Sequence, residues 1–204
     1  MKPMEIETRS MQIIESELKT PLAPELAPIV KRVIHATADF SFADTLRFTP
    51  GVVPLMRNML RQGVTLVTDT QMALAGINKK AASRLPVALR CFMAQEEVAR
   101  EAEERDITRA AVSMEKALSL PGPKLLVCGN APTFLLSLLD RPLPREVAVI
   151  GVPVGFVNVV EAKEKLLGSG LPCIVAAGRK GGSTVAAAIV NALLYGVEGA
   201  RSCD

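Results

Sequence analysis

KLLVCG, residues 124–129, is one of several short runs of almost uninterrupted apolar residues in this sequence. The others are VTLVTD (64–69), PVALRC (86–91), EVAVIG (146–151) and PCIVAAG (172–178). Apolar runs of this length are typical of strands that are covered on both faces. Because longer helical patterns alternate with them, the sequence predicts a mostly parallel sheet in a single-domain, three-layer α/β/α sandwich over residues 1–204.

Helical patterns fill the intervals between these runs. They span residues 4–18, 24–37, 51–62, 94–105, 108–119, 131–139, 158–167 and 182–195. In the last of them, Val185, Ile189 and Leu193 recur at helical spacing, so this face is expected to pack on the sheet. The proline-rich stretches at 118–124 and 140–146 are short, which favours surface connections over domain linkers.

Composition and charge exclude several classes of partner. The chain has 24 Lys and Arg against 21 Asp and Glu, a formal charge of +3 that is too small to favour nucleic acid. With 3% aromatic residues and no Trp, few side chains could stack on single-stranded bases. The first 20 residues lack the apolar core of a signal peptide, and no later segment resembles a membrane span. We therefore expect a protein that binds neither nucleic acid nor a membrane.

The cysteines indicate the compartment. Cys91, Cys128, Cys173 and Cys203 lie far apart and form neither a CxxC pair nor the close Cys/His spacing of a zinc site. The first three lie in or beside apolar runs, which favours buried thiols over nucleophiles. We expect a cytoplasmic protein with no metal site and no cofactor.

Turns that contain glycine follow several predicted strands, at the edge where ligands of open α/β sheets bind. They include GNAPT (129–133), GVPVGF (151–156) and GRKGGST (178–184). GRKGGST is not a P-loop, in which Lys directly precedes Ser or Thr, and no GxGxxG follows a strand, so ATP, GTP and NAD are disfavoured. The candidate that remains is a carboxylate site, and an ordinary tight turn with solvated cations is the alternative. Its members are Arg179, Lys180, Gly181, Gly182 and Ser183.

Other candidate residues have ordinary structural explanations. Asn130 and Thr108 lie at predicted helix starts, where both residue types act as caps, and Arg109 would then point into solvent. His35 is the only histidine and lies near the end of a predicted helix, where a cation is favoured by the helix dipole. Asp39 is near enough to orient the imidazole if the helix continues.

Read together, the motifs resemble the precorrin-8X and cobalt-precorrin-8 methylmutases of cobalamin biosynthesis. The resemblance runs in one order through RSMQII (9–14), KRVIHATADF (31–40), TDTQMALAGI (68–77), ITRAA (107–111), GNAPT, GVPVGFVNVVEAK (151–163), GRKGGS and NAL (191–193). Two departures are visible: Ala38 replaces a usual Gly, and residues 158–160 replace a GAA-like run. The first leaves the geometry of the helix end near His35 open.

The resemblance implies a reaction and roles for several residues. A methyl group migrates from carbon 11 to carbon 12 of ring C in a tetrapyrrole, an isomerisation that consumes no cofactor. His35 is implied as the catalytic residue that protonates or hydrogen-bonds the ring C region, and Arg109 as the clamp of a substrate carboxylate. The implied lining of the substrate site comprises Ser10, Thr108, Asn130, Gly155 and residues 179–183.

The resemblance also bears on partners. It implies a homodimer with the pocket between subunits. The stretch TDTQMALAGINKK (68–80) is closer to the anaerobic branch, in which the substrate carries cobalt, but no set of metal ligands accompanies it. A non-catalytic tetrapyrrole carrier is the alternative, and a carrier has no need of a proton donor at His35.

Overall fold

A six-stranded sheet forms the centre of the molecule, with strand order β1-β6-β5-β4-β2-β3. The structure, a computed structural model, describes residues 3–197. The strands are β1 (Leu46–Phe48), β2 (Val64–Thr68), β3 (Val87–Arg90), β4 (Lys124–Cys128), β5 (Val147–Gly151) and β6 (Cys173–Ala176). Strands β2 to β6 are parallel, and β1 pairs antiparallel with β6. The predicted mostly parallel sheet is therefore confirmed.

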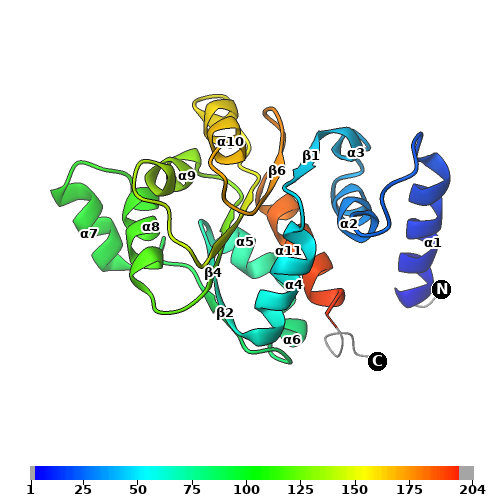
Figure 1. Cartoon of the computed structure of the whole chain (residues 1–204), viewed down its shortest axis with the longest axis horizontal. Coiled ribbons are helices and arrows are strands. Elements are labelled where there is room, and N and C mark those ends of the chain that lie inside the picture. The colour runs from blue at the N-terminus through cyan, green and yellow to red at the C-terminus, as the bar shows by residue number, and fades with distance from the viewer. Residues whose placement is uncertain (1–2, 198–204) are drawn as a thin grey trace.

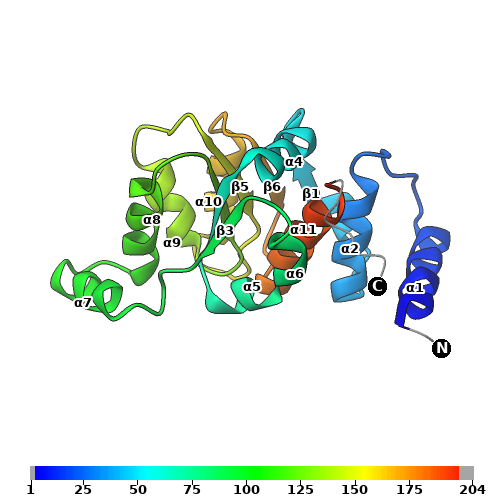
Figure 2. The same cartoon turned by 90° about the horizontal axis from the view of Figure 1, so that it is seen from below.

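Helices cover both faces of this sheet (Figures 1 and 2). One face carries α2 (Ala27–Thr37), α4 (Val52–Gln62), α5 (Gln71–Gly76), α6 (Lys79–Ala82) and α11 (Ser183–Tyr195), and the other carries α8 (Arg109–Ser119), α9 (Pro132–Leu139) and α10 (Val159–Leu167). A short helix, α3 (Phe42–Thr45), leads into β1, and α7 (Glu96–Glu104) packs on α8. The three-layer architecture is confirmed.

Strand β4 shows why its sequence is continuously apolar. Leu125 and Val127 belong to the core on the α11 side, whereas Leu126 and Cys128 belong to the core on the α9 side. Successive side chains of a strand point to opposite faces, so both sets are buried. Helix α11 is buried almost all round because α2 and α5 cover the side that faces away from the sheet.

Helix α1 (Pro3–Glu17) lies outside the three layers, against α2 (Figure 1). Arg32 donates to Glu7 at 2.6 Å, and Lys31 forms an ion pair with Glu15. Ile14 is buried, but most other side chains of α1 are exposed. Two ion pairs and the packing of Ile14 and Met11 therefore hold this helix at one end of the molecule.

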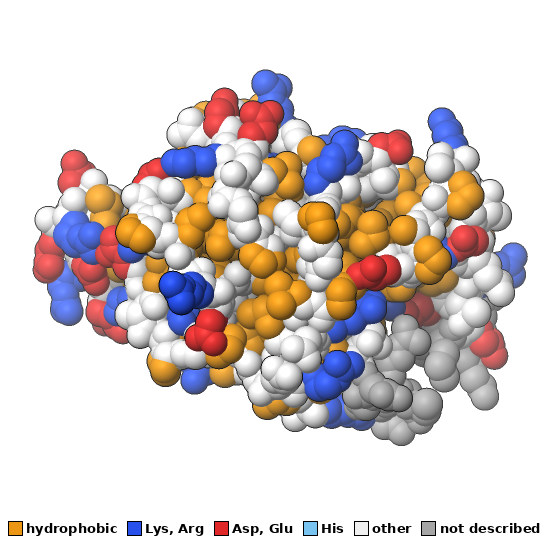
Figure 3. Space-filling model, viewed as in Figure 1, with side chains coloured by type: hydrophobic (Ala, Val, Ile, Leu, Met, Phe, Trp, Pro, Cys, Tyr) orange, Lys and Arg blue, Asp and Glu red, His pale blue; other side chains and the backbone are white. Residues whose placement is uncertain are grey.

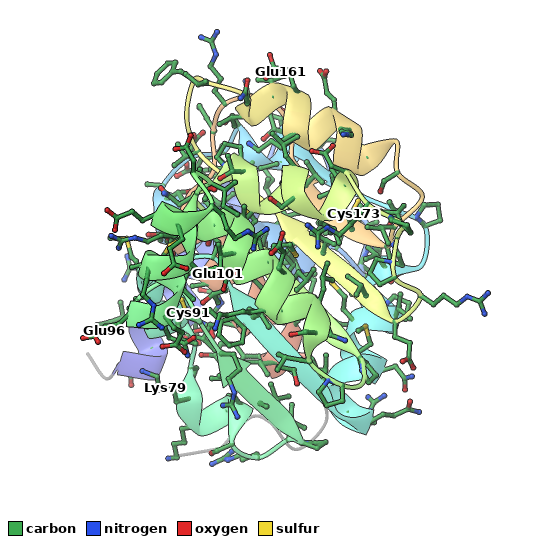
Figure 4. The ribbon with its side chains drawn as sticks, turned by 90° about the vertical axis from the view of Figure 1, so that its left-hand side faces the viewer. Lys79, Cys91, Glu96, Glu101, Glu161 and Cys173 are labelled. Carbon is green, nitrogen blue, oxygen red and sulfur yellow. The ribbon has the colours of Figure 1, made fainter. Side chains whose placement is uncertain are left out.

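The opposite end of the molecule carries charges that pair with one another. Arg105 bonds Glu101 and Glu115, each at 2.6 Å, and Arg141 bonds Glu115 at 3.2 Å. Figure 3 shows acidic and basic side chains intermingled at the α7 and α8 end, and Figure 4 labels Glu96 and Glu101 there. This end is a solvated surface.

The short elements are the ones that sequence patterns did not predict. Helices α3, α5 and α6 and strand β1 are only three to six residues long, too short to display a period. Helix α2 begins later than predicted, with Pro28 in its first turn. Among residues 3–197, no helix is long and apolar enough to cross a membrane, and no group of acidic, Cys or His side chains could hold a metal ion.

Candidate active site

Turns from four strands pack against one another at the carboxyl edge of the sheet. Thr70, after β2, shares a hydrogen bond of 2.9 Å between its hydroxyl and that of Ser183. A Cβ on Gly129 would lie 2.8 Å from the Cα of Ser183, and one on Gly181 would lie 2.1 Å from the carbonyl oxygen of Val152. Only glycine allows these two backbone approaches. The motifs after β2, β4, β5 and β6 therefore form one cluster.

Asp69 holds the turn after β4 with a buried carboxylate. It lies directly after β2 and is fully buried. Its oxygens accept the backbone N–H groups of Gly129 at 3.0 Å, Asn130 at 2.7 Å and Ala131 at 2.8 Å. These charge-assisted bonds compensate the burial of the charge. Three successive amides of the turn consequently point inward, toward Asp69.

The cysteine thiols are inert in this setting. Burial, reinforced by the carboxylate of Asp69, raises the pKa of the Cys128 thiol well above its usual range. Burial also raises the pKa of Cys173 to about 11. Both thiols are buried, as predicted, whereas Cys91 is only partly buried and Cys203 lies outside the described residues.

The two predicted helix caps have different outcomes. Thr108 does cap α8, since its hydroxyl oxygen accepts the N–H of Ala111 at 3.1 Å, and Arg109 is exposed on the first turn. Asn130 is not a cap, because α9 begins after Ala131 and no side chain caps it. The side chain of Asn130 is instead exposed at the carboxyl edge while its amide is bonded to Asp69.

Lys163 holds the loop after β6 with a buried ammonium. The side chain extends from α10, is only 1% exposed, and donates to the carbonyl oxygens of Gly178 at 2.7 Å and Lys180 at 2.9 Å. The carbonyl between them, that of Arg179, accepts the N–H of Gly155 at 3.2 Å. Burial lowers the pKa of Lys163 to about 8. Three successive carbonyl groups of the loop thus face the protein.

The amides of this loop are mostly free to meet a ligand. Among residues 3–197, no hydrogen bond involves the N–H groups of Arg179, Lys180 and Gly181. The N–H of Gly182 instead donates to the carbonyl oxygen of Val152 at 2.8 Å. The amides of this loop that remain for a ligand are therefore those of residues 179–181.

Lys180 connects the loop to the end of α2. Its ammonium donates to a carboxylate oxygen of Asp39 at 2.7 Å and to the hydroxyl of Ser41 at 3.0 Å. The hydrogen bond from Lys180 holds the pKa of the Asp39 carboxyl at about 2. The Asp39 carboxyl therefore stays charged at neutral pH, and Lys180 is partly committed to it.

His35 is exposed on the last turn of α2. The helix ends at Thr37 because Ala38 adopts a left-handed conformation with φ of 53°. Asp39 bonds Lys180 and Ser41, and no described hydrogen bond joins it to His35, so the expectation that Asp39 orients the imidazole is not met. The left-handed Ala38 also explains why a glycine is usual at this position in the family that the sequence resembles.

An exposed apolar segment borders the loop. Phe156 and Val157, between β5 and α10, are 81% and 76% exposed. The guanidinium of Arg179 lies 5.4 Å from the centre of the Phe156 ring. Apolar surface beside cations and free amides suits a ligand that has both an apolar face and carboxylates.

Not every predicted site residue joins this cluster. Ser10 bonds the carbonyl of Ile6 within α1, outside the three layers. Thr108 and Arg109 begin α8, on the face of the sheet opposite to α2. Among residues 3–197, no hydrogen bond or ion pair joins Ser10 or Arg109 to His35 or to residues 178–183. Within a single chain, the end of α2 joins the turns at the carboxyl edge, but Ser10 and Arg109 do not.

Sequence reasoning missed two buried charges that shape the site, Asp69 and Lys163. The signal for Lys163 was its register, since it lies four residues after Val159 and three before Leu166, on the buried face of α10. The signal for Asp69 was a lone carboxylate directly after an apolar strand. A charge in an apolar register is a sign that it has a dedicated partner.

Comparisons with known proteins agree with this geometry. The family model described as precorrin-8X methylmutase matches residues 5–196. The chain is 42% identical over 201 residues to the cobalt-precorrin-8 methylmutase of Salmonella typhimurium, covering 95% of each protein. It is 40% identical to that of Methanothermobacter thermautotrophicus, covering 93% of this chain and 91% of the relative.

The fold has a solved counterpart. The crystal structure of precorrin-8x methyl mutase from Thermus thermophilus superposes with a TM-score of 0.87 and 35% sequence identity, covering 96% of this chain and 98% of that one. The layers of the fold and nearly the full length of the chain correspond. The chain belongs to the precorrin-8X methylmutase family.

Proposed function

We propose that this chain is an isomerase that moves a methyl group from carbon 11 to carbon 12 of ring C in precorrin-8 or its cobalt form, a step of cobalamin biosynthesis. The observation that carries the proposal is the family match over residues 5–196. It is supported by a single histidine that is exposed on the last turn of α2, the helix whose end is followed by Asp39, the partner of Lys180 in the loop after β6. The product is cobyrinate or hydrogenobyrinate.

His35 acts as the proton donor. Histidine is the side chain that most often serves as a general acid or base in enzymes, and its imidazole can both donate and accept a hydrogen bond. A proton or hydrogen bond delivered to the ring C region lets the π-system accept the migrating methyl group. The bond from carbon 11 to the methyl group breaks as the bond to carbon 12 forms. Substrate and product are isomers, so any proton lent by His35 is returned.

The loop after β6 binds substrate carboxylates. The amides of Arg179 and Gly181 and the side-chain charges of Arg179 and Lys180 favour anions, and the macrocycle carries several acetate and propionate groups. The exposed ring of Phe156 offers apolar contact to the face of the macrocycle. Carboxylates and an apolar plane on one ligand thus match the two kinds of surface at this edge.

A second copy of the chain completes the site. Ser10 and Arg109 lie away from His35 within one chain, and a homodimer would let these residues of one subunit face the carboxyl edge of the other. Arg109 is exposed at a helix start, free to clamp a carboxylate with its planar fork.

We also place the enzyme in the cytoplasm, since Cys91, Cys128 and Cys173 are free thiols.

The test uses His35→Ala with cobalt-precorrin-8, following the ring C methyl group by NMR. Loss of a positioned general acid lowers rates by about 10²-fold or more, while corrinoid binding should stay close to that of the parent. Asn58→Ala, an exposed change on α4, is the control and should leave both quantities unchanged.

Two outcomes would contradict the proposal. A folded His35→Ala protein that retains more than about a tenth of the parental rate would make the histidine a structural residue, because general-acid catalysis contributes more than that. A parent that binds corrinoids but never moves the methyl group would instead be a carrier.

A further inference from the structure

The mechanism above leaves the buried ammonium of Lys163 unexplained. Its side chain is 1% exposed, yet no carboxylate among residues 3–197 forms an ion pair with it. Moving a charge out of water is unfavourable unless strong partners replace the water. Here the partners are two backbone carbonyls of one loop, so the ammonium is dedicated to that loop.

The two carbonyls determine the direction of two amides. In a trans peptide the C=O and the following N–H point in opposite directions within one plane. The carbonyl of Gly178 points to Lys163, so the N–H of Arg179 points away from it. By the same geometry, the carbonyl of Lys180 directs the N–H of Gly181 away. Both amides are among those without a described partner.

The same loop is linked to the helix that carries His35. The backbone of Lys180 accepts from Lys163, while its side chain donates to Asp39 and Ser41. Asp39 follows the end of α2 by two residues. A continuous series of hydrogen bonds therefore runs from α10, on one face of the sheet, to the end of α2 on the other.

We propose that Lys163 is a positioning residue, which turns the amides of Arg179 and Gly181 toward the site and thereby builds the carboxylate-binding surface of the loop. The inference rests on the proposed function, since it assigns the source of that anion site. Lys163 does not touch the substrate. It acts through the loop backbone, with a positive charge that also favours an anion on the far side of the peptide groups.

Few other titratable groups face this ammonium. The thiols of Cys128 on β4 and Cys173 on β6 are held protonated by burial, and α9 has no titratable side chain. In the loop, Arg179 and Lys180 are exposed. On α10 itself, Glu161, Glu164 and Lys165 are exposed, and Figure 4 shows Glu161 pointing away from the body of the molecule.

The first test compares Lys163→Met with Lys165→Met. Methionine keeps most of the side-chain volume and removes the donors, whereas Lys165 is an exposed lysine of the same helix that pairs with Asp140. We expect hydrogen exchange of the two bonded amides that report on this loop, those of Gly155 and Gly182, to be at least tenfold faster in Lys163→Met, and KM for the corrinoid to rise at least tenfold with a smaller change in kcat. Lys165→Met should match the parent in both measurements.

A second readout needs no variant. As pH rises through about 8, Lys163 loses its proton, and a neutral amine forms weaker hydrogen bonds to the two carbonyls. Exchange of these amides, corrected for its intrinsic pH dependence, should therefore accelerate with a midpoint near that pH in the parent. The inflection should be missing in Lys163→Met, or in Lys163→Gln if the first variant does not fold.

The outcomes separate this inference from the proposed function. Unchanged exchange at Gly155 and Gly182 in a folded Lys163 variant, or an exchange at these amides that has no inflection in the parent, would overturn the positioning role even if the enzyme is fully active. A parent without methylmutase activity would overturn the proposed function, while the exchange measurements would still decide what Lys163 does.

Discussion

The turn after β4 and the loop after β6 lie at the same edge of the sheet, but they are held in opposite ways. Asp69 binds three successive amides of the first, and Lys163 binds two carbonyls of the second. By the geometry of the trans peptide, the carbonyls of Gly129 and Asn130 then point away from Asp69, whereas the amides of Arg179 and Gly181 point away from Lys163. A buried charge of either sign can select which half of the peptide group is offered to a ligand.

This difference divides the site into two kinds of surface. Acceptor groups near Asn130 suit the N–H groups or a cationic part of a ligand, whereas donor groups near Arg179 and Gly181 suit carboxylates. Sequence patterns did not distinguish the direction of the peptide groups in the two turns, since both contain glycine and follow a strand. The side chains that distinguish them are Asp69, directly after β2, and Lys163 on α10.

The largest effect on stability is expected from removing the buried carboxylate of Asp69. Asp69→Ala leaves three amides without their acceptor in a buried setting, and loss of such a network typically costs about 3–5 kcal/mol of the free energy of unfolding. Chemical denaturation measures it. Asp69→Asn keeps one acceptor oxygen in the same volume and should lose less. A loss below about 1 kcal/mol in Asp69→Ala, the scale of an ordinary hydrogen bond, would mean that the turn does not depend on Asp69.

An intermediate effect on stability is expected from the charge of the buried Lys163. The pKa of Lys163 is lowered to about 8 in the folded protein from an ordinary 10.5, so between these values the unfolded chain binds more protons. Stability should therefore rise with pH across this window, by up to about 3 kcal/mol. Cys128 and Cys173 act in the opposite direction because burial raises the pKa of each thiol.

The difference in the free energy of unfolding between the parent and Lys163→Met, followed against pH, isolates the contribution of the lysine, because both proteins contain the two thiols. Denaturation from pH 7 to 10.5 supplies the data. If the parent gains no stability over Lys163→Met across this range, the ammonium is better solvated than its position implies, and the contrast with Asp69 weakens.

The smallest effect on stability is expected at Ala38, at the end of α2 and next to Asp39, the partner of Lys180. Ala38→Gly should stabilise the fold by about 0.5–1 kcal/mol, because glycine adopts the left-handed conformation of Ala38 without strain. Ala36→Gly, two residues earlier inside α2, is the matched control and should destabilise by about 1 kcal/mol. Thermal unfolding distinguishes the two signs. A loss of stability in both variants would show that residue 38 is not strained.

The sequence predicted the layers of this fold because apolar runs and helical periods report burial directly. It did not predict α5 or β1, whose few residues have no period. It predicted the end of α2 at Thr37 but not the left-handed conformation of Ala38, since an alanine gives no signal for it. The carboxyl edge followed from the mostly parallel arrangement of the strands. The direction of each peptide group at that edge did not, because it depends on side chains from other elements.

The link between Lys180 and Asp39 also has a consequence for the folding rate. These residues are 141 positions apart, and β1 pairs with β6 across a similar separation. Contacts between distant parts of a chain carry a high loop-closure entropy and form slowly. We therefore expect the link between Asp39 and the loop after β6 to form late in folding, after the less distant pairings of β2 with β4 and of β4 with β5.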